Sequence, residues 1–157
     1  MTRSFAAFVL IAGGLLLIPS GHAAGPASLV AKDQAGLALQ GYDVVAYFTD
    51  NRAVRGDARY TSGYGGATYR FASAGHLALF VKDPVRYLPQ YGGFCAFGAS
   101  QREGHTAIAD PEAFTVVDGK LYLNYNKEVQ KVWNRDREKS IRQANINWER
   151  LRAGSKP

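Results

Sequence analysis

Apolar side chains recur at every second residue in some segments of the chain and at every third or fourth residue in others. The first spacing is typical of half-buried strands and the second of amphipathic helices. Two β-hairpins are predicted where alternating segments flank a glycine-containing turn: 59–64 with 67–71 around Gly65-Gly66, and 115–117 with 120–125 around Asp118-Gly119. A further short strand is predicted over 37–40. In the last strand, Leu121, Leu123 and Tyr125 alternate with polar or tyrosine positions, which predicts burial of one face only.

Helical segments follow residues that can cap a helix N-terminus. Asp43 precedes a short helical turn over 44–48, and Ser73 precedes a helix that ends before Pro84. Asp110-Pro111 predicts the start of another helical turn, because proline is favoured at the first helical position. Three apolar stripes at helical spacing complete the prediction: Leu77, Phe80 and Val81; Val129, Val132 and Trp133; and Ile141, Ala144, Trp148 and Leu151.

These elements predict an α+β domain over residues 37–152, in which small antiparallel β-hairpins pack with short helices and a helical C-terminal segment. A hydrophobic fraction of 46% with a charged fraction of 20% excludes an ordinary disordered chain. Residues 25–36 are small and polar, so we predict a flexible lead-in there. Residues 153–157 are interpreted as a tail.

The first 24 residues have the order of a secretory signal peptide. Arg3 precedes an apolar stretch over 5–18, and Pro19 is followed by small residues as far as Ala24. Cleavage after Ala23 or Ala24 fits, and we take Ala24. The stretch is shorter than the ~20 apolar residues of a membrane span, so an anchoring helix is the weaker interpretation. We therefore expect an exported soluble protein, periplasmic or extracellular, with no transmembrane span in the mature chain.

Positive charge is concentrated near the C-terminus. Residues 127–157 hold nine basic and four acidic side chains, whereas residues 25–126 balance at zero. Such a segment could contact an acidic partner or an anionic membrane surface peripherally, but a solvated helix with mixed charges is the simpler interpretation. The export signal argues against nucleic acid as a partner.

The segment around Cys95 holds the most local chemical information. Gly92 and Gly93 permit a sharp turn or a close approach to a neighbour, and the thiol that follows is flanked by Tyr91 and Phe94. These rings could shield a metal or a thiolate, or could be core. Since the chain has one cysteine, a disulfide within it is excluded, and Cys95 is a buried thiol, an intermolecular partner, or a reactive or metal-bound group.

Several motifs together carry a family resemblance over nearly all of residues 37–151. They are Gly41-Tyr-Asp-Val-Val-Ala-Tyr-Phe48, Tyr69-Arg-Phe71, Tyr91-Gly-Gly-Phe-Cys95, Asp110-Pro-Glu-Ala-Phe114 and Val117-Asp-Gly-Lys-Leu-Tyr-Leu-Asn-Tyr125. With them the chain resembles the YHS domain family, and within it the exported single-domain branch. None of these motifs is a catalytic signature, so no catalytic residue is assigned.

The resemblance implies a metal-handling role, because binding of a metal such as copper has been proposed for this family from its paired cysteines. This chain departs from the pattern, since only Cys95 matches and no second cysteine completes a pair. His105, ten residues later, is the candidate replacement ligand, although it could equally be a surface histidine. Thiolate and imidazole donors together suit Cu(I) or Zn(II).

Three hypotheses of different classes follow from these observations. The first is an exported metal-binding module, for copper or zinc, that uses Cys95 and His105. The second is a non-catalytic module that binds a protein partner, with Cys95 structural. The third is a thiol enzyme in which His105 activates Cys95, and it is the least favoured because no Cys-x-x-Cys or nucleophile motif is present.

Overall fold

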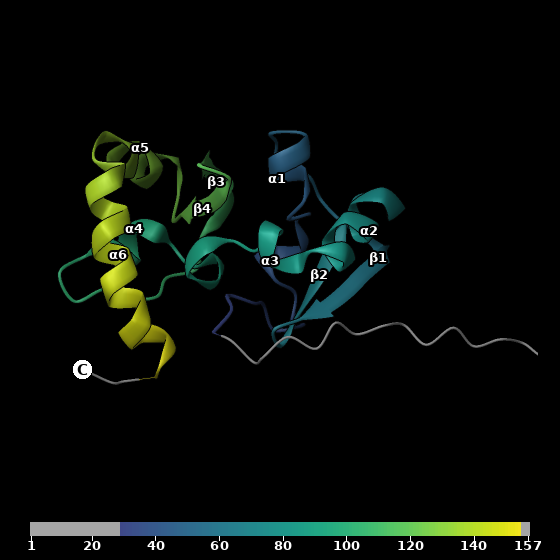
Figure 1. Ribbon diagram of the computed structural model, residues 1–157, viewed down its shortest axis with the longest axis horizontal. Helices are drawn as coiled ribbons and strands as arrows, with labels where there is room; N and C mark the ends of the chain where they lie inside the picture. The colour runs from purple at the N-terminus through teal and green to yellow at the C-terminus, as the bar shows by residue number, and fades with distance from the viewer. Residues whose placement is uncertain (1–28, 155–157) are drawn as a thin grey trace, which may run out of the picture.

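The computed structural model describes residues 29–154, and the predicted leader lies outside this range. Short helices alternate with two hairpins along the chain, and the longest helix comes last (Figure 1). The elements are 3₁₀ helix η1 (Leu39–Gly41), helix α1 (Ala46–Thr49), strands β1 (Asp57–Tyr64) and β2 (Ala67–Phe71), helices α2 (Ala74–Lys82) and α3 (Pro84–Tyr87), 3₁₀ helix η2 (Gln90–Gly93), helix α4 (Ala96–Ser100), strands β3 (Asp110–Val117) and β4 (Lys120–Asn124), and helices α5 (Lys127–Arg135) and α6 (Arg137–Arg152). The predicted α+β class is confirmed.

Both predicted hairpins form as antiparallel two-stranded sheets. Their turns are built from residues with positive φ, with Gly65 and Gly66 at 58° and 84°, and Asp118 and Gly119 at 50° and 69°. Two consecutive left-handed residues match the right-handed twist of the strands, which is why glycine and aspartate suit these positions.

The predicted caps of the first half are also present. The Ser73 hydroxyl accepts a hydrogen bond from the N–H of His76 and starts α2. The Asp83 carboxylate, a cap that was not predicted, accepts one from the N–H of Arg86 and starts α3. Asp43 precedes α1, and its Oδ1 accepts the N–H of Val45. These side chains satisfy backbone donors that the first helical turn leaves free.

Two hydrophobic cores divide the molecule, with β1, β2 and α1–α3 on one side and α4–α6 with the second hairpin on the other (Figure 1). Strand β4 separates the cores: Leu121 and Leu123 belong to the first, and Tyr122 belongs to the second with Trp133 and Ala144. The expected half-buried pattern of this strand is therefore wrong, because both of its faces are covered.

Other expectations are corrected by the structure. Residues 37–40 do not form a strand: Leu37 makes one isolated bridge to Thr68, and the chain then turns into η1. Asp110-Pro111 opens β3 rather than a helix, at a register shift before Phe114 where the missing proline N–H is tolerated. Three predicted core residues are exposed instead: Val81, Tyr125 and Val132.

The lead-in contributes structure where it is described. In residues 29–36, Ala31 is buried, and its N–H donates to the carbonyl of Gly92 at 2.9 Å. Lys32 makes an isolated antiparallel bridge with Ala38. This part of the predicted flexible segment thus lies against the turn that precedes Cys95.

Candidate functional site

The turn before Cys95 has left-handed backbone at three consecutive residues. In η2, φ is 53° at Tyr91, 60° at Gly92 and 83° at Gly93. A Cβ placed on Gly92 would lie 2.1 Å from the carbonyl oxygen of Leu29, so both the backbone angle and the neighbour require glycine here. The predicted sharp turn and close approach are therefore present.

Cys95 itself is buried, with 2% of its surface exposed. Its Sγ accepts the N–H of Gly98 at 3.4 Å, in the position of a helix cap for α4, and the N–H of Tyr125 at 3.2 Å. The thiol donates toward Oδ1 of Asn124, 4.0 Å away. The sulfur thus satisfies two backbone donors in a region that water does not reach.

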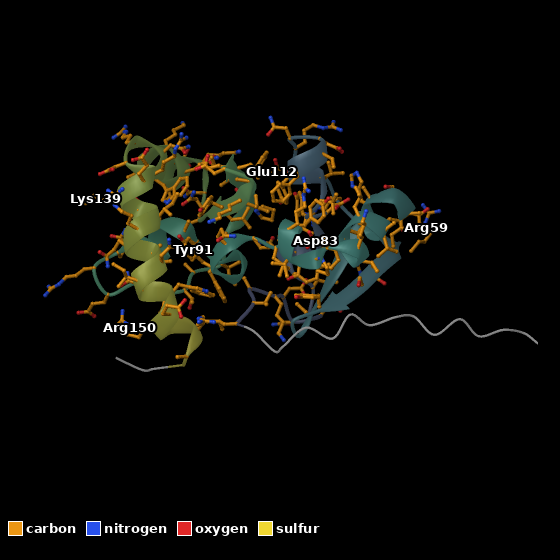
Figure 2. The ribbon with its side chains drawn as sticks, in the orientation of Figure 1. Arg59, Asp83, Tyr91, Glu112, Lys139 and Arg150 are labelled. Atoms are coloured by element: carbon orange, nitrogen blue, oxygen red, sulfur yellow. The ribbon has the colours of Figure 1, made fainter. Side chains whose placement is uncertain are left out.

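The aromatic residues around Cys95 pack against the last helix. The ring centroid of Trp148, on α6, lies 5.9 Å from that of Tyr91 and 6.3 Å from that of Phe94. The Tyr91 hydroxyl donates to Oδ1 of Asn145 at 3.0 Å, and burial raises the pKa of this tyrosine. Tyr91 therefore belongs to the second core, in the half of the molecule that contains α6 (Figure 2).

The second predicted ligand, His105, is exposed. The backbone N–H of His105 donates to the carbonyl of Gly98. The ring nitrogen Nε2 of His105 would lie 3.2 Å from a Cβ placed on Gly98. Gly98 thus contacts both candidate residues, yet no hydrogen bond joins Cys95 to His105 within residues 29–154. In the same range, no three histidine, cysteine, aspartate or glutamate side chains are grouped so that they could hold a metal ion.

A groove of about 360 Å³ lies beside this turn, and the sequence did not predict it. Its walls come from two segments far apart in the chain, Val85 to Gly92 and Asn145 to Glu149. Val85 is 68% exposed, Leu88 and Trp148 are half-buried, and Pro89 and Tyr91 are buried parts of the wall. No signal in the sequence indicated the groove, because the helical spacing assigned Trp148 to the core and nothing local places it beside Val85.

The chain matches no protein-family model, no curated protein and no solved structure. Among the described residues, no helix has the length and apolar character needed to cross a membrane.

Proposed function

We propose that this chain is an exported YHS-type domain that acts as a non-catalytic binding module for a protein partner, in the periplasm or outside the cell, with Cys95 in a structural role. The groove between α3, η2 and α6 carries this proposal. The state of Cys95 supports it, because a buried sulfur that caps α4 and accepts the N–H of Tyr125 is engaged in holding the fold.

The groove offers an aromatic anchor point between walls of mixed polar and apolar character. The half-buried Trp148 provides rigid aromatic surface, and tryptophan side chains carry much of the binding energy in protein interfaces. The exposed Val85 extends this apolar surface outward. An aliphatic or aromatic side chain from a partner would cover this surface, and each Å² of apolar surface removed from water would contribute roughly 25 cal/mol to binding.

The charge of the neighbouring helices suggests which partner segment would fit. Residues 127–157 carry an excess of five positive charges. Arg142 and Arg150 of α6 are both exposed, and Arg150 lies near the end of α6 that follows Trp148 (Figure 2). Among the described residues, the one charged side chain that lines the groove, Glu149, is already paired with Arg152. We therefore propose an extended partner segment with an apolar anchor flanked by acidic residues, which the exposed arginines of α6 would attract. An anionic membrane surface is the alternative to a protein partner as the source of negative charge. Nucleic acid is not expected as a partner.

Site-specific photo-crosslinking in the native compartment tests this function. A photoreactive amino acid at Val85 should capture one defined protein, and the same group at the exposed Tyr125, outside the groove, is the matched control. Trp148→Ala should abolish the Val85 product, and circular dichroism checks its folding, because Trp148 also packs against Tyr91 and Phe94. Equal products from both positions, or none from Val85, would contradict the proposal, and crosslinks to lipid alone would favour a membrane surface.

Metal handling by Cys95 and His105 is the second candidate. The favouring observation is that both residues contact Gly98, so a local rearrangement of α4 could bring thiolate and imidazole onto one copper or zinc ion. Native mass spectrometry with Cu(I) and Zn(II), beside Cys95→Ser and His105→Ala, tests it. Loss of a bound metal in both variants would support this role, and equal binding in Cys95→Ser would reject it.

A further inference from the structure

Asp43 is a buried carboxylate whose oxygens are all engaged. Its exposed fraction is 0%. Oδ1 accepts the N–H groups of Val45 at 2.8 Å and Ala46 at 3.4 Å, and Oδ2 accepts the N–H of Ala72 at 2.7 Å. The fourth contact joins Oδ2 to Nδ1 of His76 at 2.6 Å. The sequence predicted Asp43 as a cap only, because nothing local places it beside a histidine 33 positions later.

This contact fixes the orientation of the His76 ring. A carboxylate at Nδ1 accepts a hydrogen bond from the N–H of that nitrogen, so Nε2 carries the lone pair and can act as an acceptor or ligand when the imidazole is neutral. Nε2 lies 3.4 Å from Oγ1 of Thr49 and 3.9 Å from Oδ1 of Asp50. The side chains of His76 and Asp50 are 18% and 31% exposed, so solvent can reach them.

We propose that Nε2 of His76 and the carboxylate of Asp50 form a site for a divalent cation of the zinc class, with water and the Thr49 hydroxyl completing its coordination. Asp43 is the positioning residue that holds the imidazole through Nδ1. Histidine ligands commonly donate their second ring nitrogen to a carboxylate in this way, which fixes the tautomer and raises the basicity of the ligand.

The spacing of the donors is compatible with this assignment. Zinc bonds of about 2.0–2.2 Å in a tetrahedral sphere place neighbouring ligand atoms roughly 3.3 Å apart. The distance of 3.9 Å from Nε2 to the Asp50 carboxylate is slightly longer. Asp50 follows the last residue of α1 and is partly exposed, so rotation of its side chain can close the difference, at the expense of the hydrogen bond that its Oδ1 accepts from the Thr49 hydroxyl at 2.7 Å.

This site is separate from the Cys95 region. His76 lies on α2 and Asp50 at the end of α1, whereas Cys95 caps α4 in the other half of the molecule (Figure 1). It contains no thiol, and its nitrogen and oxygen donors suit Zn(II) or Cu(II) rather than Cu(I). With His76, Asp50 and the Thr49 hydroxyl as its protein donors, the site leaves one tetrahedral position open for water or for a donor from another molecule.

Zinc titration of the processed chain, purified without an affinity tag, tests the proposal. Isothermal titration calorimetry should give one Zn²⁺ per chain, and nitrogen NMR of the imidazoles should show the metal on Nε2 of His76. His76→Gln should abolish binding. Asp50→Asn, at an exposed position that the fold does not require, should weaken it by about tenfold or more, and Asp43→Asn by about 10–100-fold.

Two variants serve as matched controls. His105→Gln removes the other described imidazole and Cys95→Ser removes the thiol, and both should bind Zn²⁺ as the original chain does. Binding that is lost in these controls and kept in His76→Gln would overturn the proposal in favour of the Cys95 region. Absence of zinc binding, or unchanged binding in both His76→Gln and Asp50→Asn, would mean that Asp43 and His76 form only a structural ion pair.

Discussion

The backbone N–H of Tyr125 donates a hydrogen bond to Sγ of Cys95 at 3.2 Å, across 30 positions of the chain. The contact joins the end of β4 to the start of α4, where the same sulfur also accepts the N–H of Gly98. The Gly98 donor would otherwise be buried without a partner, which costs about 1–3 kcal/mol. The sulfur is therefore part of the connection between the hairpin and the helices.

The thiol of Cys95 should react slowly in the folded protein. Because it is buried and engaged, a disulfide reagent should reach it only through local or global opening, so labelling should accelerate strongly in urea. A cysteine placed at the exposed Thr61, in a Cys95→Ser background, supplies the rate of an accessible thiol. Labelling of native Cys95 at that control rate would contradict a structural role.

Asp43→Ala should be strongly destabilising. The substitution leaves the N–H groups of Val45 and Ala72 without their acceptor and removes the partner of His76. Each buried donor left without a partner costs about 1–3 kcal/mol in free energy of unfolding, so the loss of two backbone contacts and the histidine contact is large. Urea denaturation measures it, with Asp50→Asn as a control expected to change stability by less than about 1 kcal/mol. Similar losses in both variants would contradict the role assigned to the buried carboxylate.

The elements that the sequence predicted are those set by local chemistry. Gly65-Gly66 and Asp118-Gly119 determine their hairpin turns, and Ser73 begins α2, because the residues involved are neighbours in the chain. Strand β4 was mispredicted because the cover on its second face comes from Trp133 and Ala144, which no alternation within the strand can reveal. Pro111 fits either a helix start or a strand beside a register shift, so its identity alone did not decide between them.

In the candidate site, too, features set by neighbouring residues could be predicted and features set by distant residues could not. The turn at Gly92 could be predicted, since glycine is the residue that accepts its backbone angle. The environment of Cys95 could not, because Asn124 and Tyr125 reach the sulfur only through the fold. The groove beside Trp148 and the contact between Asp43 and His76 depend on long-range placement in the same way.

Gly92→Ala should destabilise the protein more than Gly66→Ala. Both glycines have positive φ, so each alanine pays the backbone strain of roughly 1–2 kcal/mol. At Gly66 nothing lies within 4 Å of the added Cβ, whereas at Gly92 the carbonyl oxygen of Leu29 lies 2.1 Å away. Thermal or urea unfolding of the two variants isolates the effect of this contact. Equal losses would mean that the segment at Leu29 moves aside without cost.

Tyr47→Phe should lower stability at neutral pH, and this deficit should shrink above pH 10. The Tyr47 hydroxyl donates to the carbonyl of Pro111 at 3.0 Å, a hydrogen bond worth about 1 kcal/mol. Burial is the main cause that raises the pKa of this phenol above its ordinary value of 10.0. The unfolded chain therefore ionises Tyr47 first, so its contribution is complete below pH 10 and is lost as the pH rises beyond it.

Urea unfolding of the original chain and of Tyr47→Phe, measured from neutral to strongly alkaline pH, checks this prediction. Phenylalanine does not ionise, so the variant lacks the alkaline loss that Tyr47 contributes. Burial also raises the pKa values of Tyr69 and Tyr91, and both proteins share the destabilisation from these residues. The difference between the two proteins therefore isolates Tyr47. A difference that stays constant across the whole range would mean that Tyr47 ionises in the folded protein at its ordinary pKa, which would contradict its burial between the body of the domain and β3, where it contacts Pro111 and Phe114.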